Sequence, residues 1–277
     1  MPWINLLGND IHYTDAGAGQ PVVLVHGHGS TAACWEPFIE ALKGDFRVVA
    51  YDSYDHGFSV NSPRNGHPAD RAEELEAFID GLGLVRPIIM GQSMGGMTTL
   101  RWAIRHPHEA AALVSCGMAW PINLPMPGES DQNEIASALD PEERIWLGVG
   151  TSFTRDWINA NPVEYARYIR IRSTAPAIEA ARHPRNLRAS LGEFVSADPA
   201  DVKRMRDGLA AVTSPLMVFV GSEEMPAIRA GAEETAALVP NTRLVVVQGA
   251  AHNAYYQRQD LLLENLRQLV SGVLTDA

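Results

Sequence analysis

Apolar residues follow two different spacings along this chain. Short continuous runs such as Val22–Val25 and Ile88–Met90 are typical of strands that are buried on both faces of a sheet. Between these runs, apolar residues recur every three or four positions, for example from Leu75 to Leu82, which is the spacing of an amphipathic helix. Strands that alternate with helices predict an α/β fold, in which a mostly parallel, doubly wound sheet carries helices on both faces.

The pattern assigns most of the chain to strands or helices. The predicted strands are Trp3–Leu7, Ile11–Thr14, Val22–Val25, Phe46–Tyr51, Ile88–Met90, Ala110–Ser115, Leu216–Val220 and Arg243–Val247. The predicted helices are Ala33–Leu42, Asp70–Leu82, one that follows Ser93 and ends near His106, Ala200–Ala211, Ala227–Leu238 and Asp260–Val273.

The alternation stops at about Met118. Prolines cluster after it, and only helices are predicted from Asn133 to Leu191. We interpret residues 119–205 as a helical cap inserted into an α/β core made of residues 1–118 and 206–277. Because ligands of open α/β sheets bind outside the carboxyl ends of the strands, we expect the cap to lie over that edge.

Composition and charge narrow the classes of protein that fit. The chain has 277 residues, of which 46% are hydrophobic and 20% charged, as in ordinary soluble proteins. Its formal net charge of −11 argues against a nucleic-acid partner, because phosphate binding needs a basic face. The cysteines, Cys34 and Cys116, do not suggest a disulfide framework and fit a reducing compartment. With no basic start and no long apolar stretch, we expect no secretion signal, no membrane partner and a cytoplasmic location. The sequence does not distinguish a monomer from a homodimer.

A Gly-x-Ser-x-Gly motif follows the run at Ile88–Met90 directly. Ser93 stands at its centre, and a helical pattern begins immediately afterwards. A strand, a sharp turn and a helix with a serine at the bend make up a nucleophile elbow. The glycines at positions 91 and 95 would let the strand and the helix approach each other closely. Ser93 is therefore the candidate nucleophile.

A nucleophilic serine needs a base and an acid that orients the base. His252 follows the last predicted strand and is the candidate base. Glu223 and Glu224 follow the strand before it, and either carboxylate could be the acid. The end of the strand at Ala110–Ser115 offers no carboxylate, which strengthens this choice.

An oxyanion hole needs two hydrogen-bond donors. The backbone N–H of Met94, directly after the serine, is the first candidate. The second is the backbone N–H of His28, in the His-Gly-His-Gly loop after Val22–Val25. The alternative is that His26 and His28 bind a metal ion, but no cysteine or carboxylate accompanies this pair, so we expect no metal site.

With these motifs the chain resembles the α/β-hydrolase fold family, in the large group that carries a helical lid. The resemblance rests on Gly91-Gln92-Ser93-Met94-Gly95-Gly96, on His26-Gly27-His28-Gly29, on His252, and on the turn from Asp52 to Ser59. In that turn Asp55 replaces a glycine of the usual pattern. The family's acid usually stands three residues after the glycine that ends its strand, which favours Glu224 over Glu223.

The resemblance implies a serine hydrolase that needs no cofactor. Ser93 would attack the carbonyl of a small carboxylic ester or lactone, with His252 as base, and water would release the acyl group. Serine at this position excludes relatives that use aspartate there, namely haloalkane dehalogenases and epoxide hydrolases. Among related activities, Gly-x-Ser-Met-Gly-Gly resembles carboxylesterases, enol-lactonases and cofactor-free perhydrolases. The alternatives are a hydrolase of carbon–carbon bonds in ring-cleavage products, which usually has Asn where this chain has Gln92, and a receptor that keeps the fold without catalysis.

Two sets of residues in the predicted cap bear on the substrate. Its aromatic side chains either line a substrate pocket or pack the cap helices together; the candidates for substrate binding are Trp120, Trp146, Trp157 and Tyr168. A group of arginines also stands out in an acidic protein: Arg167, Arg170, Arg172, Arg182, Arg185 and Arg188. One of them could bind a substrate carboxylate, or all could lie on a solvated helix face.

Overall fold

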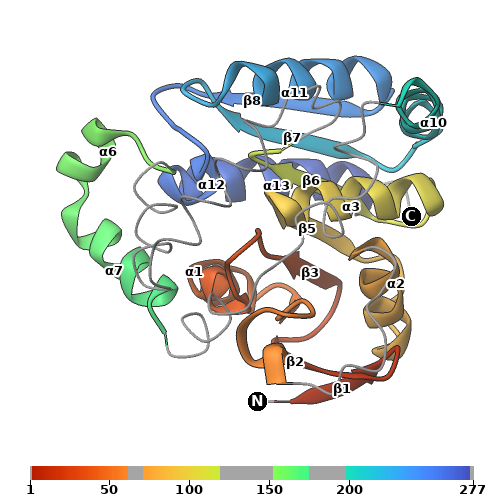
Figure 1. Cartoon of the computed structure of the whole chain (residues 1–277), viewed down its shortest axis with the longest axis horizontal. Helices are drawn as coiled ribbons and strands as arrows, with labels where there is room; N and C mark the ends of the chain where they lie inside the picture. Colours follow the sequence, from red (N-terminus) through yellow and green to blue (C-terminus); the bar gives the residue numbers. More distant parts are fainter. Residues whose placement is uncertain (1, 62–70, 119–151, 175–197, 275–277) are drawn as a thin grey trace.

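One sheet organises the part of the chain that the computed structural model describes, which is residues 2–61, 71–118, 152–174 and 198–274. Its strands run in the order β1-β2-β4-β3-β5-β6-β7-β8 (Figure 1). Strand β2 pairs antiparallel with β1 and β4, and the pairs from β4 to β8 are parallel. The strands are β1 Trp3–Leu6, β2 Asn9–Ala16, β3 Pro21–Val25, β4 Arg47–Tyr51, β5 Ile88–Gln92, β6 Ala112–Cys116, β7 Leu216–Gly221 and β8 Thr242–Val247. The predicted α/β fold with a mostly parallel sheet is confirmed.

Helices pack on both faces of this sheet. Side chains alternate along the strands, so that Val23 and Val25 of β3 enter one apolar core while Val22 and Leu24 enter the other. The first core is closed by α2 Arg71–Gly81, α3 Met94–Arg105, α10 Pro199–Ala210 and α11 Pro226–Leu238. The second is closed by α1 Glu36–Leu42, α12 Ala254–Gln257 and α13 Gln259–Leu274. Because β3 is buried on both faces, its sequence is a continuous apolar run.

Two short elements differ from the predicted pattern. The helix predicted from Ala33 begins as the 3₁₀ turn η1 Ala32–Trp35, and α1 starts only at Glu36. Pro37 stands in the first turn of α1, where its missing N–H costs nothing. Helix α12 lies where a loop was predicted, because a single turn is too short to show a helical period. A second 3₁₀ turn, η2 Gly57–Asn61, lies after β4.

The described part of the predicted cap contains α6 Arg155–Ala160 and α7 Pro162–Arg172, which lie together at one side of the molecule (Figure 1). Helix α7 packs against η1. Helix α10 begins before the predicted boundary at residue 206, and it packs on α3 and α11 of the core. Most of residues 119–205 lies outside the described residues, so the division into core and cap stays a prediction.

Over the described ranges, no helix combines the length and the apolar character that crossing a membrane requires.

Candidate active site

A strained turn places Ser93 between β5 and α3. Its backbone has φ 54° and ψ −117°, a conformation that residues other than glycine rarely adopt. A β-carbon on Gly91 would lie 2.0 Å from the carbonyl oxygen of Gly95, and one on Gly95 would lie 2.0 Å from that of Val25. Both glycines are therefore required by the close approach of strand and helix, as the motif predicted.

His252 approaches this serine from the loop after β8. Its Nε2 lies 3.0 Å from Ser93 Oγ. The loop crosses Gly117 at the end of β6, where φ is +69° and a β-carbon would come within 2.7 Å of the His252 carbonyl oxygen. Gly117 is a residue that sequence reasoning did not assign to the site, and its signal was a glycine directly after a buried strand.

Glu224 lies on the far side of the imidazole. Its Oε2 is 2.7 Å from His252 Nδ1, and its Oε1 accepts a hydrogen bond from the backbone N–H of Met225 at 3.0 Å. The carboxylate is buried, with 3% of the side chain exposed. Glu223 is exposed and pairs instead with the hydroxyl of Ser222. The carboxylate fixes the proton of His252 on Nδ1, so that Nε2 faces the serine as an acceptor.

The loop after β3 lies against the elbow. A β-carbon on Gly27 would come within 3.1 Å of Ser93 Cβ and 2.2 Å of Gln92 Oε1, so only glycine permits this contact. His28 is partly buried in the same loop, and Met94 is the first residue of α3. Their assignment to an oxyanion hole remains a prediction. The positions of His28 and Met94, in segments that adjoin Ser93, are compatible with it.

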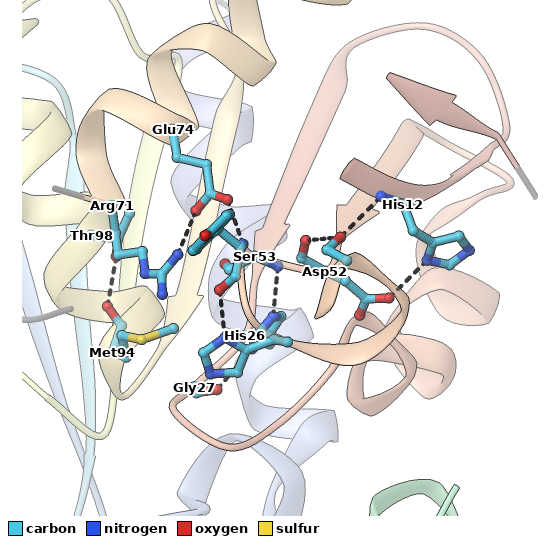
Figure 2. A network of polar contacts seen from close by, with 12 residues as sticks. His12, His26, Gly27, Asp52, Ser53, Arg71, Glu74, Met94 and Thr98 are labelled. Atoms are coloured by element: carbon cyan, nitrogen blue, oxygen red, sulfur yellow. Dashed lines mark hydrogen bonds and ion pairs between the residues drawn. The ribbon is translucent and has the colours of Figure 1, made fainter. Parts of the chain in front are cut away.

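Histidine side chains hold that loop to the turn after β4. The Nδ1–H of His26 donates to the carbonyl of Gly27 at 2.8 Å, and its Nε2 accepts the N–H of Ser53 at 3.0 Å (Figure 2). From the opposite loop, His56 Nε2 accepts the N–H of Gly29 at 3.1 Å. Both ring nitrogens of His26 are engaged in backbone bonds, so this histidine has no lone pair left for a metal ion.

Burial keeps His26 neutral. Desolvation lowers the pKa of its imidazole to about 4, and the opposing attraction of Asp52 is smaller. The cations Arg71 and Arg172 also lower this pKa. Since the ring must be uncharged to accept the N–H of Ser53, the anchoring of the loop after β3 depends on a neutral histidine.

The cap aromatics that the structure describes are engaged in packing. Trp157 stacks on Phe153 with ring centroids 4.9 Å apart, and its indole N–H donates to the carbonyl of Gln257 at 3.2 Å. Tyr168 is buried, and its hydroxyl accepts a hydrogen bond from Asn253 at 3.0 Å. Their substrate-binding role stays a prediction. Trp120 and Trp146 lie outside the described residues.

Only part of the arginine group can be located. Arg170 is exposed on α7, whereas Arg172 is partly buried with its Nε shielded from solvent. No carboxylate of the described residues pairs with Arg172. Arg167 is partly buried and lies near Tyr256. Burial raises the pKa of Tyr256, and the positive charge of Arg167 opposes part of this rise. Arg182, Arg185 and Arg188 lie outside the described residues.

A parallel sheet with an elbow serine, and a histidine and a carboxylate at neighbouring strand ends, defines a class of proteins. The chain belongs to the α/β-hydrolase fold family, whose model matches residues 20–259. Haloalkane dehalogenase 2 of Mycobacterium tuberculosis is 33% identical over 119 residues, which cover 43% of this chain and 41% of that protein. The aligned region thus spans about two fifths of the length of such curated relatives.

Solved structures match over nearly the whole chain. The enol-lactonase of Burkholderia xenovorans LB400 has a TM-score of 0.78 at 22% identity and covers 98% of this chain and 100% of its own. A thermophilic esterase of Thermogutta terrifontis has a TM-score of 0.76 at 21% identity, with 99% of each chain covered. At this level of identity the likeness shows the fold alone.

The two neighbouring glutamates give a matched pair of variants. Glu224→Ala should slow the labelling of Ser93 by a fluorophosphonate on the order of 10³-fold, because the imidazole loses the group that orients it. Glu223→Ala should label at the wild-type rate, since that side chain faces solvent. The labelling rate of each folded variant is measured by mass spectrometry. The opposite ranking would move the acid to Glu223.

His26 should make the folded protein less stable in acid. The unfolded chain takes up a proton near pH 6.5, while the folded protein takes it up only near pH 4. Stability is therefore full above about pH 6.5 and falls as the pH drops toward 4, by on the order of 3 kcal/mol in total.

His26→Gln isolates this contribution, because its amide oxygen can accept the N–H of Ser53 and does not titrate. Denaturant unfolding at pH 7 and at pH 4.5 should show a smaller loss of unfolding free energy in the variant than in the wild type. Equal losses in the two proteins would contradict a neutral His26 in the folded state.

Proposed function

We propose that this chain is a serine hydrolase that cleaves a carboxylic ester or lactone of a small molecule through an acyl-enzyme on Ser93. The observation that carries the proposal is the continuous hydrogen-bonded line from Ser93 Oγ to His252 Nε2, at 3.0 Å, and from His252 Nδ1 to Glu224, at 2.7 Å. Nucleophile, base and orienting acid are each within hydrogen-bond reach of the next, which is the geometry that acyl transfer requires.

The proposed reaction has two halves. His252 Nε2 takes the proton of Ser93 as Oγ bonds to the substrate carbonyl carbon, and the imidazolium then protonates the leaving alkoxide. In a lactone the leaving group stays attached to the acyl chain. Water, deprotonated by the same imidazole, releases the acid and restores Ser93. Glu224 stabilises the imidazolium in both halves because it is a buried acceptor on Nδ1.

Negative charge develops on the substrate oxygen in each half. Met94 begins α3, where unpaired N–H groups and the positive end of the helix dipole favour an anion. His28 lies in the loop that contacts the elbow at Gly27. We assign the two oxyanion donors to the backbone N–H groups of Met94 and His28.

Other reactions of the family fit this site less well. A dehalogenase-type reaction needs a carboxylate at the elbow, whereas this chain has the hydroxyl of Ser93. A carbon–carbon hydrolase and a cofactor-free perhydrolase would use the same serine and histidine, so substrate assays separate them from an esterase. A receptor without turnover does not require a buried carboxylate that orients the imidazole of His252, as Glu224 does here.

We further propose that the substrate carries a carboxylate, which Arg172 binds. This guanidinium belongs to the last residue of α7, which packs against η1, and its charge lowers the pKa values of His26 and Tyr168. Its Nε is buried, and no carboxylate of the described residues neutralises it. A buried N–H without a hydrogen-bond partner is costly, so an anion supplied by the ligand would stabilise this arrangement.

Replacing the nucleophile tests the reaction. Wild-type protein should hydrolyse short p-nitrophenyl esters, and Ser93→Ala should lose at least about 10³-fold in kcat because no acyl-enzyme can form. Release of p-nitrophenol is followed by absorbance, and mass spectrometry of a fluorophosphonate-treated sample locates the adduct. Turnover that persists in the variant, with labelling elsewhere, would rule out Ser93.

The carboxylate is tested with a pair of esters of equal length. One is the mono-p-nitrophenyl ester of a dicarboxylic acid, and the other carries a methyl group in place of the free carboxylate. Arg172→Ala should lower kcat/KM for the anionic ester about 10- to 100-fold, the worth of a charge-assisted bond. It should leave the neutral ester within about twofold.

Arg170→Ala is the matched control for this test, because that side chain is exposed on the same helix. It should keep the wild-type ratio between the two esters. An Arg172→Ala protein that loses activity equally on both esters would show that the arginine supports the fold and does not read a carboxylate.

A further inference from the structure

A buried line of hydrogen bonds joins the cap helix α7 to both loops that carry Ser93 and His252. The amide of Gln92 donates through Nε2 to Asn253 Oδ1 at 3.3 Å. The amide of Asn253 in turn donates through Nδ2 to the hydroxyl of Tyr168 at 3.0 Å. These residues come from the end of β5, the loop after β8 and the middle of α7, which are distant in sequence.

Both amides of this line are next to proposed catalytic residues in the chain. Gln92 immediately precedes Ser93, and Asn253 immediately follows His252. Gln92 also presses its Oε1 against Gly27, where an added β-carbon would meet it at 2.2 Å. A shift of either amide therefore moves the nucleophile, the base or the oxyanion loop.

All members of the line are shielded from water. Gln92, Asn253 and Tyr168 are 6%, 2% and 4% exposed, so their polar groups depend on other side chains for hydrogen bonds. The hydroxyl of Tyr168 also bonds to the side chain of Tyr255. The ring of Tyr168 is fixed by edge contacts with Phe153 at 4.9 Å and Tyr256 at 4.8 Å. The hydroxyl of Tyr168 is thus a fixed point to which the two loops are attached.

We propose that Tyr168, Asn253 and Gln92 are positioning residues that set the distance between Ser93 and His252. The inference rests on the proposed function, because it assigns a cap residue to the alignment of that triad. The bond between Ser93 and His252 and this line both join the two loops, so the line helps to keep their separation constant while the substrate is absent. Tyr168 then acts through the neighbours of the triad and touches no reacting atom.

Removing single polar groups tests the proposal without opening cavities. Tyr168→Phe deletes only the hydroxyl, and Gln92→Met replaces the amide by an apolar chain of similar length. Each variant should slow fluorophosphonate labelling of Ser93 and lower kcat about tenfold, with KM changed less. The double variant should be no slower than the slower single variant, because both changes cut the same line.

Tyr256→Phe is the matched control. Its ring belongs to the same aromatic cluster, but its hydroxyl bonds to the carbonyl of Glu164 at 3.5 Å and does not reach either loop. This control should label Ser93 at the wild-type rate. A merely structural role for Tyr168 would lower Tm in Tyr168→Phe and leave the labelling rate of the folded protein unchanged.

The outcomes separate this inference from the proposed function. If the wild type is labelled, two results would overturn the positioning role alone. The first is that Tyr168→Phe is labelled at the wild-type rate, and the second is that the effects of the two single variants multiply in the double variant. Absence of labelling in the wild type would overturn the proposed function. In that case amide hydrogen exchange decides the positioning role, since it must speed up at residues 91–94 and at residues 250–254 in Tyr168→Phe but not in Tyr256→Phe.

Discussion

The close approach of β5, α3 and β3 at the elbow is the constraint on which the rest of the site depends. It forces Ser93 to a positive φ of 54°, a conformation that costs on the order of 1–3 kcal/mol for a residue with a side chain. Backbone hydrogen bonds fix this turn on both sides: the N–H of Ser93 donates to the carbonyl of Cys116 at 2.8 Å, and the carbonyl of Ser93 accepts the N–H of Met97 at 3.1 Å. The strained conformation is maintained by the ends of strands β5 and β6 and by helix α3, all of which are buried independently of the serine side chain.

The same device recurs at the other strand ends. A β-carbon on Gly221, which ends β7, would lie 2.0 Å from the carbonyl oxygen of Ala250, and Gly117 stands in a similar relation to His252. Because these glycines let the loop after β8 settle directly on β6 and β7, His252 reaches the elbow and Glu224 reaches His252. Three close backbone approaches, rather than long side chains, thus bring distant parts of the sequence together.

The strong local patterns were enough to predict the fold from the sequence. Buried strands such as β3, and β5 over Ile88–Met90, have no polar position to obscure them, and Gly-x-Ser-x-Gly marked the elbow because its glycines are sterically required. The sequence could not reveal Gln92 or Asn253, since an amide at a strand end has no periodicity and gains its partner only in the folded chain. Asp55 is a similar case: it occupies a positive φ of 63° where the family pattern has glycine, as a short polar side chain can.

The cap helix α7 connects recognition with the proposed chemistry. Tyr168 and Arg172 are four residues apart, so they lie on the same face of α7, and α7 packs against η1. Tyr168 accepts a hydrogen bond from the amide of Asn253, which follows His252 in the chain, while Arg172 has no anion among the described residues. A carboxylate that binds Arg172 would neutralise a charge on the same rigid turn that fixes the two loops. Substrate charge would thereby stabilise the position of α7 that aligns Ser93 with His252, so affinity and alignment would depend on one helical turn.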